Sequence, residues 1–152
     1  MKNKIESMNN KEKAVEASIA YFDSGFGCAE AVLKAVAEYK GIESDLIPRL
    51  ATGFCGGMAR TNGMCGAVTG GVLTLNLLYG RDDVVQDKEA NYKAIQEFIT
   101  IFRERFNDVN CPGLTGVDLG TEEGQQAFKE RNLHPRCANF VGEATRMVLE
   151  TI

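Results

Sequence analysis

Three cysteines of this chain stand where helices are expected to begin. Each directly follows residues that interrupt a helix: Cys28 follows Gly25 and Gly27, Cys65 follows Asn62 and Gly63, and Cys137 follows His134 and Pro135. The unpaired N–H groups and partial positive charge of a helix N-terminus favour the thiolate, which binds metals and attacks disulfides. We therefore expect these thiols to ionise readily, and the pKa of Cys65 to fall below the usual value of about 8.5.

The same cysteines each begin an apolar stripe at helical spacing. Val32, Val68 and Val141 continue the three stripes, which predicts that all three thiols face inward. An isolated inward-facing cysteine usually packs as a small core residue. Three with the same placement favour a shared thiol site, with ordinary core packing as the alternative.

A shared site would have to be assembled by the fold. Cys28, Cys65, Cys111 and Cys137 are separated by 37, 46 and 26 positions, so that no local Cys-x-x-Cys motif is present. This spacing argues against a thioredoxin-like site, a zinc finger and a covalent haem attachment site. Four thiolates from four segments could hold an iron–sulfur cluster or a tetrahedral zinc ion, or could form two redox-active pairs. The residues themselves leave these possibilities open.

Other chemistry has little support in the sequence. His134 is the one histidine and is expected to be a cap or surface residue, with a ligand or proton-relay role as the alternative. No nucleophile-elbow, Walker or dinucleotide-binding motif is present. The acid pairs at residues 82–83 and 122–123 stand where helices begin, and we expect them to interact with the helix dipole.

The composition predicts one domain in the cytoplasm. A chain of 152 residues can bury a sizeable core without disulfides or metal. Its net charge of −4 and the absence of a basic block argue against nucleic acid as a partner. The most apolar segment, residues 67–79, is too short to span a bilayer, which takes about twenty apolar residues. The N-terminus is polar and carries no secretion signal, which predicts reduced thiols in the cytoplasm.

Helical periodicity dominates the chain, and strand alternation is nearly absent. It predicts a compact all-α domain of six or seven helices over residues 11–152, after a polar tail at residues 1–10. Helices are expected at residues 11–22, 28–39, 44–53, 64–79, 83–106, 121–131 and 136–150, with a glycine-rich loop at residues 54–63. In the central helix, Gly66 and Gly70 leave a groove for a neighbouring helix or for a flat cofactor.

The central motif resembles a known family. Residues 65–70 read Cys-Gly-Ala-Val-Thr-Gly, which is similar to the Cys-Gly-Ala-x-x-Gly signature of the C_GCAxxG_C_C family of small bacterial and archaeal proteins. Cys28, Cys111 and Cys137 fall where the family's other cysteines are expected, and the resemblance extends from about Lys11 onward. Cys55 departs from the pattern; it is either a bystander or a fifth thiol close enough to Cys65 to exchange with it.

The resemblance implies a redox role, although no reaction is established for the family. Family members often accompany transporter or oxidoreductase genes, which makes such a system or another redox protein the expected partner. The chain also resembles the non-haem part of split-Soret cytochromes, where a cysteine-bound iron–sulfur cluster has been suggested. Because the haem attachment motif is absent, covalent haem is not implied.

The predicted function is redox chemistry at Cys28, Cys65, Cys111 and Cys137, acting as catalytic thiols or as metal ligands. Iron–sulfur electron transfer is the first interpretation, and reversible thiol/disulfide chemistry is the second. The alternative is a zinc-binding or purely helical interaction module without turnover. A homodimer is left open. We expect the four cysteines to gather at one end of the helical bundle.

Overall fold

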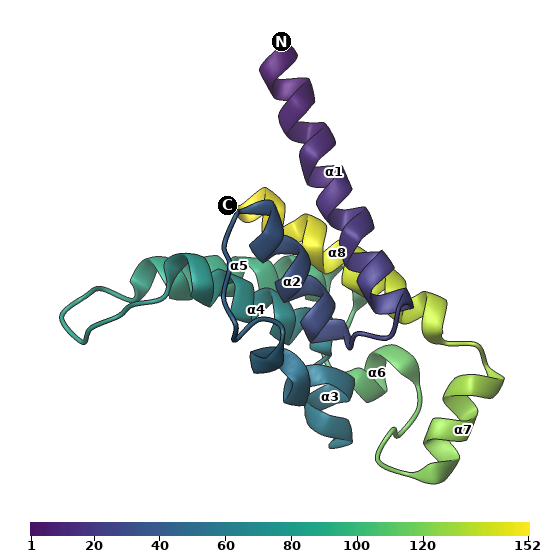
Figure 1. Cartoon of the computed structure of the whole chain (residues 1–152). Helices are drawn as coiled ribbons and strands as arrows, with labels where there is room; N and C mark the ends of the chain where they lie inside the picture. Colours follow the sequence, from purple (N-terminus) through teal and green to yellow (C-terminus); the bar gives the residue numbers. More distant parts are fainter.

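The computed structural model describes residues 1–152, except for the side chain of Lys2. Eight α-helices and one 3-10 helix follow one another along this chain (Figure 1): α1 (Lys2–Asp23), α2 (Cys28–Tyr39), η1 (Arg49–Phe54), α3 (Cys55–Arg60), α4 (Gly66–Tyr79), α5 (Glu89–Phe106), α6 (Cys111–Thr115), α7 (Glu122–Glu130) and α8 (His134–Thr151). The predicted all-α class is confirmed. The helix count exceeds six or seven because α3 and α6 are short turns inside segments that were expected to be irregular.

The core is built around α8, which packs against α1, α2, α4 and α5. Phe140 of α8 lies between two aromatic rings of α5, with its ring centroid 6.2 Å from that of Phe102 and 4.9 Å from that of Phe106. The helices meet through small and branched apolar residues such as Val68 and Val141, which are fully buried. Burial of these stripes drives folding, at roughly 25 cal/mol per Å² of apolar surface.

Helices α2 and α4 lie in close contact through a glycine. A Cβ added at Gly70 would lie 2.8 Å from the Cα and the carbonyl oxygen of Ala29. This contact confirms that Gly70 lets a neighbouring helix approach the central helix. It also brings the N-terminal turns of α2 and α4 side by side, so that Cys28 and Cys65 start from the same end of the core.

Three element boundaries differ from the prediction. First, α1 begins at Lys2 rather than at residue 11, and projects away from the core in Figure 1; the described side chains of residues 3–10 are exposed. Second, the expected helix at residues 44–53 is replaced by η1, which follows Pro48 and its missing N–H donor.

Third, residues 83–88 form turns rather than the start of α5. The side chain of Gln86 accepts hydrogen bonds from the backbone N–H groups of Asp82 and Asp83. These local bonds compete with helical hydrogen bonding.

No helix in the described chain has both the length and the apolar character needed to cross a membrane.

Candidate functional site

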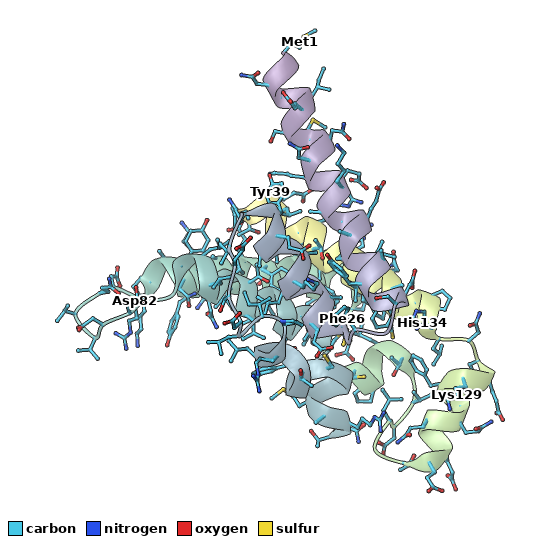
Figure 2. The ribbon with its side chains drawn as sticks, viewed as in Figure 1. Met1, Phe26, Tyr39, Asp82, Lys129 and His134 are labelled. Carbon is cyan, nitrogen blue, oxygen red and sulfur yellow. The ribbon has the colours of Figure 1, made fainter. Side chains whose placement is uncertain are left out.

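All five cysteines of the chain line one cavity of about 150 Å³. Each is a free thiol, and yellow sulfur atoms are drawn where α2, α3 and α6 meet in Figure 2. The structure thus brings together the four predicted residues and adds Cys55. Thr115, whose hydroxyl donates to the carbonyl of Cys111, and five apolar side chains complete the wall: Phe22, Leu114, Leu119, Phe128 and Phe140. No buried side-chain nitrogen or oxygen among the described residues lacks a hydrogen-bond partner. The thiols are therefore the groups of this cavity that are available for reaction or for ligand binding.

The expected placement of the thiols at helix starts is confirmed. Cys28 is the first residue of α2, Cys65 is the residue before α4, and Cys137 lies in the first turn of α8. Cys111 and Cys55 also open their helices, α6 and α3. Chain breakers next to each cysteine end one segment and start the next at the cavity, which explains how residues far apart in sequence converge there.

Cys55 lies against Cys28, a contact that the sequence did not reveal. A Cβ added at Gly27 would overlap the sulfur of Cys55, and one added at Gly66 would overlap the sulfur of Cys28. The two glycines therefore leave the room in which the two thiols meet. The interaction with the Cys28 side chain, together with burial, raises the pKa of Cys55, so that Cys55 keeps its proton at neutral pH. The sequence left Cys55 either a bystander or a thiol close enough to Cys65 to exchange with it; the structure places Cys55 in the same cavity as Cys65 and directly beside Cys28.

A carboxylate holds the two segments of this pair together. One oxygen of Glu30 accepts a hydrogen bond from the backbone N–H of Gly27 at 2.7 Å, and the other accepts one from Thr52 Oγ1 at 2.6 Å. The first bond caps α2 just before Cys28, and the second reaches η1 just before Cys55. Glu30 therefore positions both thiols through their backbones.

A second pair of cysteines is held by a short backbone bridge. Met64 and Asn110 form an antiparallel bridge. On either side of it, the N–H of Cys65 donates to the carbonyl of Val109 at 2.8 Å, and the N–H of Cys111 donates to the carbonyl of Gly63 at 2.9 Å. These hydrogen bonds fix Cys65 and Cys111 side by side at the cavity.

The expected low pKa of Cys65 is wrong. Burial raises the pKa of Cys65 to about 12. The backbone N–H groups of Ala67 and Val68 favour the thiolate and lower this pKa, but by less than burial raises it. Burial likewise raises the pKa of Cys137 to about 12, with the nearby Cys111 adding to the effect, and raises the pKa of Cys111. The helix N-terminus is present as predicted, but the loss of solvent outweighs it.

The segment that carries Cys55 has an unusual backbone. Five consecutive residues, Gly56 to Arg60, have φ between +53° and +68°, so that α3 is a left-handed turn. Non-glycine residues in this region cost roughly 1–2 kcal/mol each, and three of the five are not glycine. The sequence predicted a glycine-rich loop over residues 54–63 rather than this turn. Such strain is typical of functional sites, where surrounding contacts hold it in place.

Contacts from the core hold the left-handed turn. The carbonyl of Gly57 accepts hydrogen bonds from the N–H groups of Thr61 and Gly63 at 3.2 and 2.9 Å. A Cβ added at Gly57 would lie 2.6 Å from the Cβ of Cys111. The turn is thereby packed directly onto the bridge that carries Cys65 and Cys111.

Two residues named from the sequence lie outside the cavity wall. Gly66 lines the cavity, whereas Gly70 packs against Ala29 of α2. His134 stacks on Phe22 at a centroid distance of 4.4 Å, and its Nε2 lies 2.9 Å from Asp23 Oδ1. It joins α8 to α1, in agreement with the surface role and not with the ligand role.

The cysteines do not form a ready metal site in this arrangement. Among the described residues, no group of three or more His, Cys, Asp or Glu side chains is placed to hold a metal ion. The cavity nonetheless offers five thiols, the side chain that iron–sulfur clusters use as ligand, and the hydroxyl of Thr115 in its wall is already hydrogen-bonded to the carbonyl of Cys111.

Comparison with known proteins identifies the family. No curated protein and no solved structure matches the chain. The family model described as "Putative redox-active protein (C_GCAxxG_C_C)" matches residues 26–151, which include every cysteine of the cavity. The match covers most of the chain, and this protein belongs to the C_GCAxxG_C_C redox-active family.

Proposed function

We propose that this redox protein works by reversible thiol/disulfide chemistry, with Cys28 and Cys55 as the exchanging pair. The observation that carries the proposal is the contact between the two thiols at the cavity, where Gly27 and Gly66 leave room for both sulfurs. On oxidation the two S–H bonds break and one S–S bond forms. Two protons and two electrons then pass to an acceptor disulfide, which becomes two thiols.

The environment of the pair suits repeated exchange. Glu30 accepts hydrogen bonds from the segments that precede Cys28 and Cys55 and so restrains both segments at the pair. Cys28 is the first residue of α2 and lines the same cavity as Cys55. The sequence favoured iron–sulfur chemistry first; the contact between Cys28 and Cys55 reverses that order.

Iron–sulfur electron transfer is the second candidate, and the shared cavity favours it. Cys28, Cys65, Cys111 and Cys137 are the residues that would hold a cluster, which would supply one-electron transfer. Their surroundings are apolar, and burial keeps Cys65 and Cys137 protonated at neutral pH. Thiolates crowded in such a space need a cationic partner, which a cluster provides. Closing such a site requires small movements of the four helix starts.

One experiment separates these functions. Protein is purified anaerobically and its visible absorption is recorded; it is then oxidised with diamide, and free thiols are alkylated before peptide mapping. Disulfide-linked peptides that contain Cys28 and Cys55 in colourless protein support the proposal. Brown protein that loses its colour in Cys65→Ser but not in Cys55→Ser supports the cluster.

The remaining outcomes contradict both candidates. Bound zinc in colourless protein that forms no disulfide indicates a zinc-binding module. Protein with neither metal nor disulfide indicates a helical interaction module. Cys28→Ser is the matched variant for the pair, because it removes one sulfur and leaves the backbone contacts of α2 intact.

A further inference from the structure

We propose that the open groove beside Cys55 binds small anionic thiols and disulfides, and that these are the exchange partners of the Cys28–Cys55 pair. The groove has a volume of about 610 Å³ and runs between α3 and α7. Cys55 and Gly56 line both this groove and the cysteine cavity, so that Cys55 is the cysteine that connects the two. The inference rests on the proposed function, since it names the substrate class of the same pair.

The charge of the groove points to an anion. Arg60 and Lys129 are the charged residues that line it, and neither joins a salt bridge among the described residues. Both face the groove from opposite sides, Arg60 on the left-handed turn and Lys129 on α7, where Figure 2 labels it. Two unpaired cations in a chain of net charge −4 make this groove a basic site on an acidic protein.

The size and walls of the groove point to a small molecule. Its volume falls within the range of roughly 300–1,000 Å³ that is typical of small-molecule sites. Leu119 and Phe128 provide apolar surface beside Cys55, and both also line the inner cavity. A ligand that combines carboxylates with a short carbon chain and a sulfur matches these three features.

The left-handed turn gives the groove its arrangement. Because residues Gly56 to Arg60 have positive φ angles, the turn after Cys55 winds with the opposite hand to an ordinary α-helix. Ala59 and Arg60 then line the groove together with the preceding Cys55. The strain in this turn thus accompanies a basic side chain placed next to an accessible thiol.

The exchange balances with two thiols of the same class. Starting from the Cys28–Cys55 disulfide, a thiolate bound in the groove attacks Cys55 Sγ, and the S–S bond breaks with Cys28 leaving as a thiolate. A second thiolate attacks the ligand sulfur of the mixed disulfide and releases Cys55. Both cysteine thiolates take up protons, so that two thiols become one small disulfide and the protein disulfide becomes two thiols.

The test compares thiols of different charge on the oxidised protein. Rates of reduction are measured with glutathione, which is anionic, and with uncharged 2-mercaptoethanol; trapping with an alkylating agent and mass spectrometry follows the mixed disulfide. For each protein the rate with glutathione is divided by the rate with 2-mercaptoethanol. In this ratio, differences in the intrinsic reactivity of the protein disulfide cancel. We expect the double variant Arg60→Gln/Lys129→Gln to lower this ratio about three- to tenfold, and the ratio to fall when salt is raised to about 1 M.

A matched control has the same loss of charge elsewhere. Lys93→Gln/Arg103→Gln removes two exposed cations from α5, outside the groove, and should leave the ratio unchanged. Lys129→Gln alone, in the regular helix α7, serves if the Arg60 substitution disturbs the left-handed turn.

Two results distinguish a failure of the groove inference from a failure of the proposed function. A normal Cys28–Cys55 disulfide with an equal ratio in the wild type, the groove variants and the control overturns the groove inference alone. Oxidised wild-type protein without that disulfide overturns the proposed function.

Discussion

Replacing Ala59 by glycine should stabilise the protein, although the same change in an ordinary helix destabilises it. Ala59 has φ +53° and ψ +43°, within the left-handed region, and its side chain is exposed. A left-handed backbone costs an L residue roughly 1–2 kcal/mol, and glycine, which has no Cβ, avoids this steric penalty. Glycine also gives the unfolded chain more freedom, worth about 0.5–1 kcal/mol against the fold.

The difference is a net stabilisation of about 0.5–1 kcal/mol, or a rise in melting temperature of about 1–4 °C for a chain of this size. Urea unfolding followed by far-ultraviolet circular dichroism measures it. Ala20→Gly is the matched control, because Ala20 is exposed in the right-handed helix α1, where glycine should cost about 1 kcal/mol. Equal destabilisation by both substitutions would show that residues 56–60 are not left-handed in solution.

Three further changes test the packing, the tether and the burial of the site. Gly70→Leu should lower the free energy of unfolding by about 1–3 kcal/mol, because it pushes α2 from α4, while Gly53→Leu, where no atom lies within 4 Å of an added Cβ, should cost less; equal losses would refute the contact. Glu30→Ala should cost about 1–2 kcal/mol and slow formation of the Cys28–Cys55 disulfide, as seen by timed alkylation; an unchanged rate would show that the tether does not position the pair. Since burial raises the pKa of Cys65 and Cys137 to about 12, their protonated thiols stabilise the reduced fold fully below about pH 8.5 and this contribution is lost as pH rises toward 12. The urea midpoint should therefore fall between about pH 8 and pH 10, less steeply in Cys65→Ala/Cys137→Ala, and a slope unchanged by these substitutions would argue against their burial.

The parts of the site that could be predicted depend on local sequence. Breakers beside Cys28, Cys65 and Cys137 end and start helices whatever the rest of the chain does, and the apolar stripes say which way those thiols face. These two signals predicted the convergence of those three cysteines, and the resemblance to the family implied Cys111 as the fourth; the structure places all four at one cavity.

The parts that could not be predicted depend on long-range packing. The contact of Cys55 with Cys28 depends on clearance at Gly27 and on the hydrogen bond that Thr52 donates to Glu30, which is 22 residues away. Sequence shows that Cys65 precedes a helix but not how deeply it is buried, so the sign of its pKa shift was wrong.

The backbone of the turn shows the same limit. Paired glycines at residues 56–57 are a signal for unusual angles, yet they could not show that Met58, Ala59 and Arg60 share those angles. Contacts of the turn with the bridge segment help to hold them there, and these long-range contacts cannot be read from the sequence of the turn.

The contact between Cys28 and Cys55 links the redox state of the protein to its folding equilibrium. A disulfide between them would close a loop of 27 residues in the unfolded chain, and the chain-entropy model assigns such a loop about 3–4 kcal/mol of stabilisation. By the same thermodynamic cycle, a fold that holds the sulfurs together lowers the reduction potential of the pair. Loosening the Glu30 tether or the left-handed turn would then make the disulfide easier to reduce. The potential at which this protein exchanges electrons is therefore set by the stability of the whole helical domain as well as by its two sulfur atoms.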